Sequence, residues 1–127
     1  GAVIVSSDNR VVSASYNGPP PNYSHLNRPC TEWCPRAQPG LHLDPQYEDC
    51  PATHAEMSAI ARADWSSCAG ATIYVTGAMC MSCAKVIPQT GITRVIHRVR
   101  ETEAHRKPET VESFLFQCGI AVERYVA

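Results

Sequence analysis

Apolar residues in this chain gather in short runs that are separated by polar turns. Two runs rich in β-branched residues, 2–5 and 11–15, flank the polar turn 6–9 and predict a β-hairpin. Further apolar runs predict strands at 72–76, 93–99 and 120–125. Apolar residues at helical spacing predict helices at 54–64, 80–87 and 108–116. Strands and helices alternate after the hairpin, which predicts an α/β fold with helices packed on a sheet.

The segment at about 17–52 breaks this pattern. It holds eight of the ten prolines together with three cysteines and two histidines. A loop of this length is uncommon in a compact domain unless it is functional or internally pinned. Because 127 residues suit one domain, we expect a single domain over 1–127 that carries a Cys/Pro-rich insert.

Charge and composition narrow the classes of partner. The net charge is −1, from eleven basic and twelve acidic side chains, so we do not expect nucleic acid as a partner. Nor do we expect a membrane partner, because no apolar run approaches the roughly 18 residues of a span. No secretory leader is recognisable, and we expect a cytoplasmic protein.

One cluster of basic residues begins at Arg94 and ends at Lys107. Glu101 and Glu103 interrupt it, so a solvated face is the better interpretation. We interpret His97, within this cluster, as a strand-end residue rather than a metal ligand.

The spacing of the cysteines is more informative than their number. Seven is an odd count, which argues against a disulfide scaffold. Cys80 and Cys83 form a C-x-x-C pair, Cys30 and Cys34 form C-x3-C, and Cys50 precedes His54 by four residues. Such spacings are typical of zinc ligands in a reducing compartment.

A catalytic metal site is predicted where two of these segments converge. His54 and the pair Cys80 and Cys83 supply an imidazole and two thiolates, which leaves the fourth position of a tetrahedral Zn²⁺ open for water. Glu56, two residues after the histidine, is placed to carry protons rather than to bind the metal. The alternative is a purely structural zinc clip with a coincidental glutamate. The H-x-E and C-x-x-C signature is that of zinc deaminases.

Nearly the whole chain resembles the deoxycytidylate (dCMP) deaminase family, within the zinc-dependent cytidine deaminase superfamily. The segments that carry this resemblance are 1–5, 16–18, 54–57, 71–76, 80–85 and 91–92. The resemblance implies a three-layer fold, with a central mixed sheet and helices packed on both faces. It also implies hydrolytic deamination of dCMP to dUMP, which feeds dTMP synthesis, by a homo-oligomer.

The resemblance assigns the catalytic residues. His54, Cys80 and Cys83 would hold the catalytic Zn²⁺, while Glu56 shuttles a proton as hydroxide attacks C4 of cytosine. The same resemblance implies two substrate-binding residues, Asn17 at the sugar and Ala55. Our hypothesis is that a third residue, Arg36, meets the substrate phosphate.

A second, structural zinc is implied in the insert. Family members with a cysteine-bearing insert before His-Ala-Glu bind such a metal, and Cys30, Cys34 and Cys50 resemble its ligands. The N-terminal helix that often supplies a further cysteine in the family is not in this numbering. The fourth ligand is therefore outside it, or is His25 or His42.

Two positions depart from the family pattern near the catalytic residues. Met79 occupies the position of the proline that precedes the first zinc cysteine, and Ser58 occupies that of an asparagine. Two other functions stay open as alternatives. One is a deaminase acting on cytosine or adenosine in single-stranded DNA or RNA, and the other is a non-catalytic zinc-stapled binding module.

Overall fold

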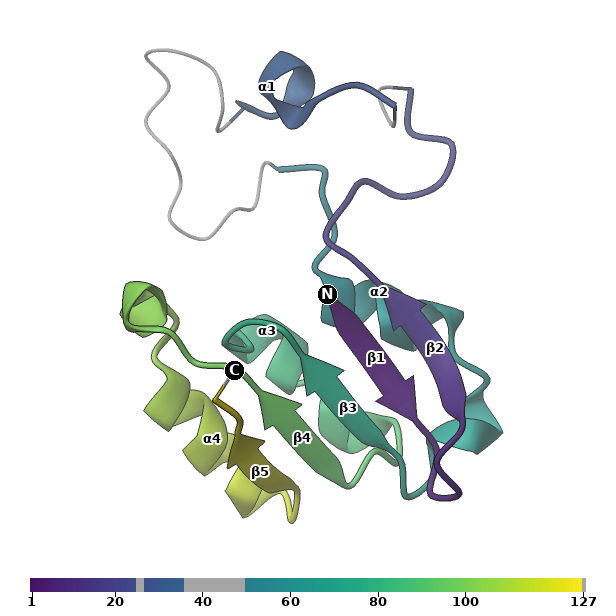
Figure 1. Ribbon diagram of the computed structural model, residues 1–127, viewed down its shortest axis with the longest axis vertical. Helices are drawn as coiled ribbons and strands as arrows, with labels where there is room; N and C mark the ends of the chain where they lie inside the picture. Colours follow the sequence, from purple (N-terminus) through teal and green to yellow (C-terminus); the bar gives the residue numbers. More distant parts are fainter. Residues whose placement is uncertain (25–26, 36–49, 127) are drawn as a thin grey trace. The chain divides into compact units, whose positions relative to one another are not determined.

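The computed structural model describes residues 1–24, 27–35 and 50–126 (Figure 1). The chain forms two compact units, and each is described by itself. One comprises Gly1–Tyr16 with His54–Ala127, and the other comprises Asn17–Thr53. The second unit begins and ends close to the boundaries of the Cys/Pro-rich segment.

A five-stranded mixed sheet forms the centre of the first unit. Its strands lie in the order β2-β1-β3-β4-β5. Antiparallel pairs join β1 to β2 and to β3, whereas β3–β4 and β4–β5 are parallel. The strand bounds are β1 Ala2–Val5, β2 Val11–Ser15, β3 Thr72–Val75, β4 Arg94–His97 and β5 Ala121–Arg124. The mixed sheet predicted from the sequence is confirmed.

Three α-helices and three short 3₁₀ helices connect these strands. The α-helices are α2 Ala55–Arg62, α3 Met81–Ala84 and α4 Pro108–Gln117. The 3₁₀ helices are η2 Trp65–Cys68, η3 Ile87–Gln89 and η4 Glu101–Arg106. The hydrophobic pattern missed η2 and η4, and the helix expected at 80–87 is α3 followed by η3. Pro88 falls within the first turn of η3, where a missing N–H costs nothing.

The core lies between one face of the sheet and these helices. Ile4, Ile73 and Val95 are paired neighbours across β1, β3 and β4, and each is fully buried. Ala59 of α2 and Leu115 of α4 belong to the same hydrophobic cluster. Figure 1 shows α2, α3 and α4 along one side of the sheet.

The opposite face of the sheet carries the alternate residues of the same strands. Val3 and Tyr74 are cross-strand partners there, and Tyr74 is 40% exposed. Together with Ile96, these residues line a groove. The sequence analysis expects helices on both faces; in the part of the first unit that the structure describes, the α-helices cover one face.

The second unit contains one described α-helix, α1, at Cys30–Trp33. The indole N–H of Trp33 donates to the carbonyl of Arg28 at 2.9 Å, which ties this turn to the chain before it. At the ends of the unit, Gly18 and Thr53 exchange backbone hydrogen bonds of 3.2 and 2.8 Å. Among the described residues of both units, every helix is too short or too polar to span a membrane.

Candidate metal centre

Two helix beginnings present the predicted metal ligands. His54 is the N-cap of α2, and its carbonyl accepts from the N–H of Ser58 at 3.0 Å. Cys80 is the N-cap of α3, after the loop that follows β3, and its carbonyl accepts from Ala84 at 3.0 Å. Cys83 lies one turn further along α3, so both thiols occupy the same side of that helix.

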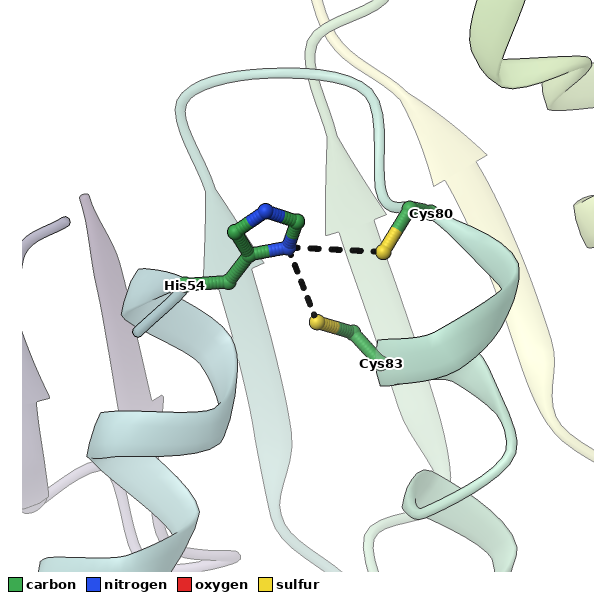
Figure 2. Close-up of side chains that lie close together, drawn as sticks. All are labelled: His54, Cys80 and Cys83. Atoms are coloured by element: carbon green, nitrogen blue, oxygen red, sulfur yellow. Dashed lines mark hydrogen bonds between the residues drawn. The ribbon is translucent and has the colours of Figure 1, made fainter. Parts of the chain in front are cut away.

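The donor atoms of these residues converge. His54 Nδ1 lies 3.4 Å from Cys80 Sγ and 3.5 Å from Cys83 Sγ (Figure 2). All three atoms lie within 4.8 Å of one another. A tetrahedral zinc with bonds of about 2.05 Å to nitrogen and about 2.3 Å to sulfur separates these two donors by about 3.6 Å. The geometry and the chemistry of the donor set therefore fit Zn²⁺.

The surroundings of Cys80 favour its thiolate. Two hydrogen bonds, the stronger influence from the Cys83 thiol and the weaker from His54, lower the pKa of Cys80 to about 3. The same hydrogen bond to Cys80 raises the pKa of Cys83, because Cys83 acts as its donor. The hydrogen bond with Cys80 also raises the pKa of His54 above its ordinary value. The cluster thus shares protons that binding of a metal cation would displace.

Glu56 lies in the first turn of α2 beside this cluster. Its side chain is buried, and burial raises the pKa of its carboxyl group. It is close enough to His54 and Cys80 for their charges to act on this pKa. Glu56 does not belong to the group of ligand atoms within 4.8 Å of one another. A buried carboxyl beside the donor set, but outside it, suits a group that carries a proton.

Side chains that the sequence analysis did not single out hold the loop before Cys80. The N–H of Ala78 donates to Glu103 Oε1 at 3.1 Å, and its carbonyl accepts from Arg106 Nη1 at 2.9 Å. The charge of Arg106 also acts on His54 and Glu56, where it opposes without cancelling the rise of both pKa values. Arg106 belongs to the basic cluster predicted as a solvated face, and Glu103 is one of the acidic residues that interrupt it, but both contact the metal loop instead.

The sequence analysis placed His97 correctly at the end of a strand, but the solvated face to which it assigned this residue is wrong. It ends β4 as expected, but its side chain is fully buried. Its Nδ1 accepts from the backbone N–H of Met79 at 3.3 Å. The one signal in the sequence for this contact was a histidine that follows the apolar pair Val95 and Ile96 at the end of a strand.

The remaining predicted site residues, apart from Ala55, belong to the segment of the second unit. Asn17 and Cys30 belong to it, and Cys34 Sγ lies 3.3 Å from Cys50 Sγ. Within the described ranges 1–24, 27–35 and 50–126, Cys30 does not join that pair in a group of three metal-binding atoms. The predictions for His25, Arg36 and His42 fall outside the described residues. Ala55, the first residue of α2, is buried.

With this geometry in place, comparison with known proteins identifies the family. Residues 1–99 match the model of the cytidine and deoxycytidylate deaminase zinc-binding region. The chain belongs to this family. The match includes α2 and α3, so the family's zinc-binding region contains the His54, Cys80 and Cys83 cluster.

Relatives within the family are identical to this chain at somewhat more than a third of the aligned positions. A deoxycytidylate deaminase of Mycobacterium phage D29 is 36% identical over 102 residues, covering 76% of this chain and 75% of the phage protein. A probable deoxycytidylate deaminase of Drosophila melanogaster is 37% identical over 98 residues, covering 76% of this chain. The match spans only 47% of the Drosophila protein, about half its length.

A solved structure of the same fold comes from cyanophage S-TIM5. Its dCMP deaminase, crystallised with dCMP and dUMP, superposes with a TM-score of 0.65 at 22% identity. The superposition covers 98% of this chain and 79% of the cyanophage chain. The deaminase-like fold predicted from the sequence is thereby confirmed.

Proposed function

We propose that this protein is a zinc-dependent deaminase that hydrolyses dCMP to dUMP and ammonia. The observation that carries the proposal is the cluster of His54, Cys80 and Cys83 with the buried carboxyl of Glu56 beside it. Membership of the family and the deoxycytidylate deaminases among its relatives support dCMP as the substrate.

The proposed reaction needs a metal that activates water and a carboxyl group, that of Glu56, that transfers protons. When held by His54, Cys80 and Cys83, zinc supplies a water acidic enough to act as a nucleophile at neutral pH. Glu56 would accept a proton from the attacking water and deliver it to N3 of the cytosine as C4 is attacked. Glu56 then carries the second proton to the amino group, the C4–N bond breaks, and ammonia leaves. Burial suits this role because it raises the pKa of Glu56.

The proposal extends to residues that would bind the rest of the nucleotide. Asn17 would contact the sugar, Ala55 would line the pocket at the start of α2, and Arg36 would meet the phosphate. A guanidinium matches the geometry of a phosphate through paired hydrogen bonds. The net charge of −1 supports a free nucleotide rather than a polynucleotide as the substrate.

The finer expectations from the sequence belong to the same proposal. A second zinc would be held by Cys30, Cys34 and Cys50, and the short approach of Cys34 to Cys50 supports this assignment. We also propose that the protein works as a homo-oligomer in the cytoplasm. The zinc content per chain would test the second zinc, and sedimentation would test the homo-oligomer.

The first test is the rate of dUMP formation from dCMP by the zinc-loaded protein. Glu56→Gln keeps the shape of the side chain but cannot exchange protons, so we expect kcat to fall roughly 100- to 10,000-fold. Zinc content should stay at the wild-type value, because Glu56 is outside the donor set. Turnover close to wild type in this variant would contradict the role of Glu56. Wild-type turnover of cytosine in single-stranded DNA, but not of dCMP, would overturn the proposed substrate.

A further inference from the structure

The peptide group that precedes Cys80 is held from inside the protein. Met79 is fully buried, and its backbone N–H donates to Nδ1 of His97, which is fully buried as well. His97 reaches this point because it ends β4 beside Val75, the last residue of β3, in the parallel pair. The loop that carries Cys80 leaves β3 at the same edge of the sheet.

The contact fixes the tautomer of His97. Because the N–H of Met79 is the donor, Nδ1 must present its lone pair, and the ring proton lies on Nε2. Nε2 then donates to Glu112 Oε1, which lies 2.9 Å away. Glu112 in turn accepts from Arg124 Nε at 2.7 Å and from Nη2 at 3.0 Å. The imidazole is therefore anchored on α4 and β5 at the end remote from the metal loop.

The backbone N–H of Met79 explains why an anchored acceptor is needed at this point. A proline, the residue expected there from the family pattern, has no backbone N–H. Methionine adds a donor in a fully buried place, and an unpaired buried N–H costs as much as a lost hydrogen bond. His97 is the acceptor that this donor finds.

We propose that His97 is a positioning residue for the metal centre. Its Nδ1 accepts the hydrogen bond from the backbone N–H of Met79. This contact holds the loop in the conformation that places the thiol of Cys80 beside His54 and Cys83. The inference rests on the metal site of the proposed function, but not on the substrate or the reaction. Glu103 and Arg106 hold Ala78, the preceding residue, through its backbone N–H and carbonyl.

A matched pair of variants tests which end of the imidazole matters. In His97→Asn the side-chain oxygen is bonded to Cγ, as Nδ1 is, so an acceptor for Met79 is kept. In His97→Gln the amide lies one carbon further out, so it can replace Nε2 toward Glu112 but not Nδ1. We expect His97→Gln to weaken zinc binding at least about tenfold, as the loss of a contact that orients a ligand does. His97→Asn should stay within about threefold of wild type.

Zinc affinity is measured by competition with a chromophoric chelator, and the cobalt-substituted proteins report thiolate ligation by their absorption spectra. The cobalt spectrum of His97→Gln should be altered, while that of His97→Asn should match wild type. Equal zinc affinities for the two variants would overturn the proposal. A wild-type protein that binds no zinc at the His54 cluster would instead overturn the proposed function.

A second pair of variants tests the inference by rescue. His97→Ala leaves the N–H of Met79 without its acceptor, and Met79→Pro alone drives the proline ring toward Nδ1 of His97. Each single change should weaken zinc binding, whereas the double variant removes both the donor and the obstacle and should recover most of the affinity. If the fold-loss of zinc affinity in the double variant equalled the product of the two single losses, a direct link between His97 and Met79 would be contradicted. Unfolding in urea with the metal chelated confirms that each variant is folded.

Discussion

Glu112 is a single residue whose charge is set by its neighbours. Burial alone would raise its pKa, but hydrogen bonds from Arg124 and His97 outweigh burial and lower the pKa below the ordinary 4.5. The carboxylate is thus the form that the folded protein stabilises. Glu112 also accepts the hydrogen bond from the ring N–H of His97, so its charge helps to hold the imidazole that contacts the metal loop.

The acid stability of the protein should depend on this carboxylate. A group whose pKa is lower in the folded state contributes stability above its unfolded pKa and loses it as the pH falls through the folded value. Glu112→Gln should therefore lower the free energy of unfolding at pH 7 by about 1 kcal/mol. That difference from wild type should shrink as the pH falls below 4.5. Urea unfolding from pH 7 to pH 3 measures it, with the exposed Glu101→Gln as the control for a lost surface charge. A difference that is constant with pH would show that the charge of Glu112 does not matter.

At the scale of elements, α4 shows how a helix is divided between core and solvent. Leu115 is fully buried against the sheet, whereas its neighbour Phe116 is 79% exposed. Leu115→Ala should lower the free energy of unfolding by about 2–5 kcal/mol, because it leaves a cavity in the core. Phe116→Ala removes a larger side chain from the same helix and should change stability by no more than about 0.5 kcal/mol. Urea titration of both variants compares them directly. A larger loss at Phe116 would mean that another surface covers that side chain.

The same elements show what the sequence could predict. Alternating burial marks β1, the first strand of the hairpin, and the run 108–116 agrees with α4 to within one residue, because both pack a regular apolar face on the core. Helix η4 has no buried residue, so no hydrophobic pattern could predict it. The positions of His54, Cys80 and Cys83 were sufficient to predict that they converge, since His54 and Cys80 each precede a helix and Cys83 lies one turn after Cys80. The contact of His97 with Met79 depends on the parallel pairing of β3 with β4, which no local pattern encodes.

At the scale of the whole molecule, the metal ligands connect parts of the first unit that are distant in the chain. His54 and Cys80 are 26 residues apart, and the segment between them contains α2, η2 and β3. A zinc ion bound by both would close this segment into a loop. Such a closure favours the folded state, because the unfolded chain does not hold the ligands in place.

Removal of zinc should therefore destabilise the first unit. Free zinc at 1,000 times its Kd stabilises a folded protein by about 4.1 kcal/mol, and binding of zinc to the unfolded cysteines reduces this figure. We expect a chelator to lower the Tm of the wild-type protein and added zinc to restore it. Cys83→Ser, which removes one ligand from the cluster, should unfold near the chelated wild type whether or not zinc is present. If the chelator left the wild-type Tm unchanged while zinc was shown to have left the protein, the cluster would not link α2 to α3. Calorimetry at matched zinc concentrations separates these outcomes, because it follows unfolding independently of any substrate.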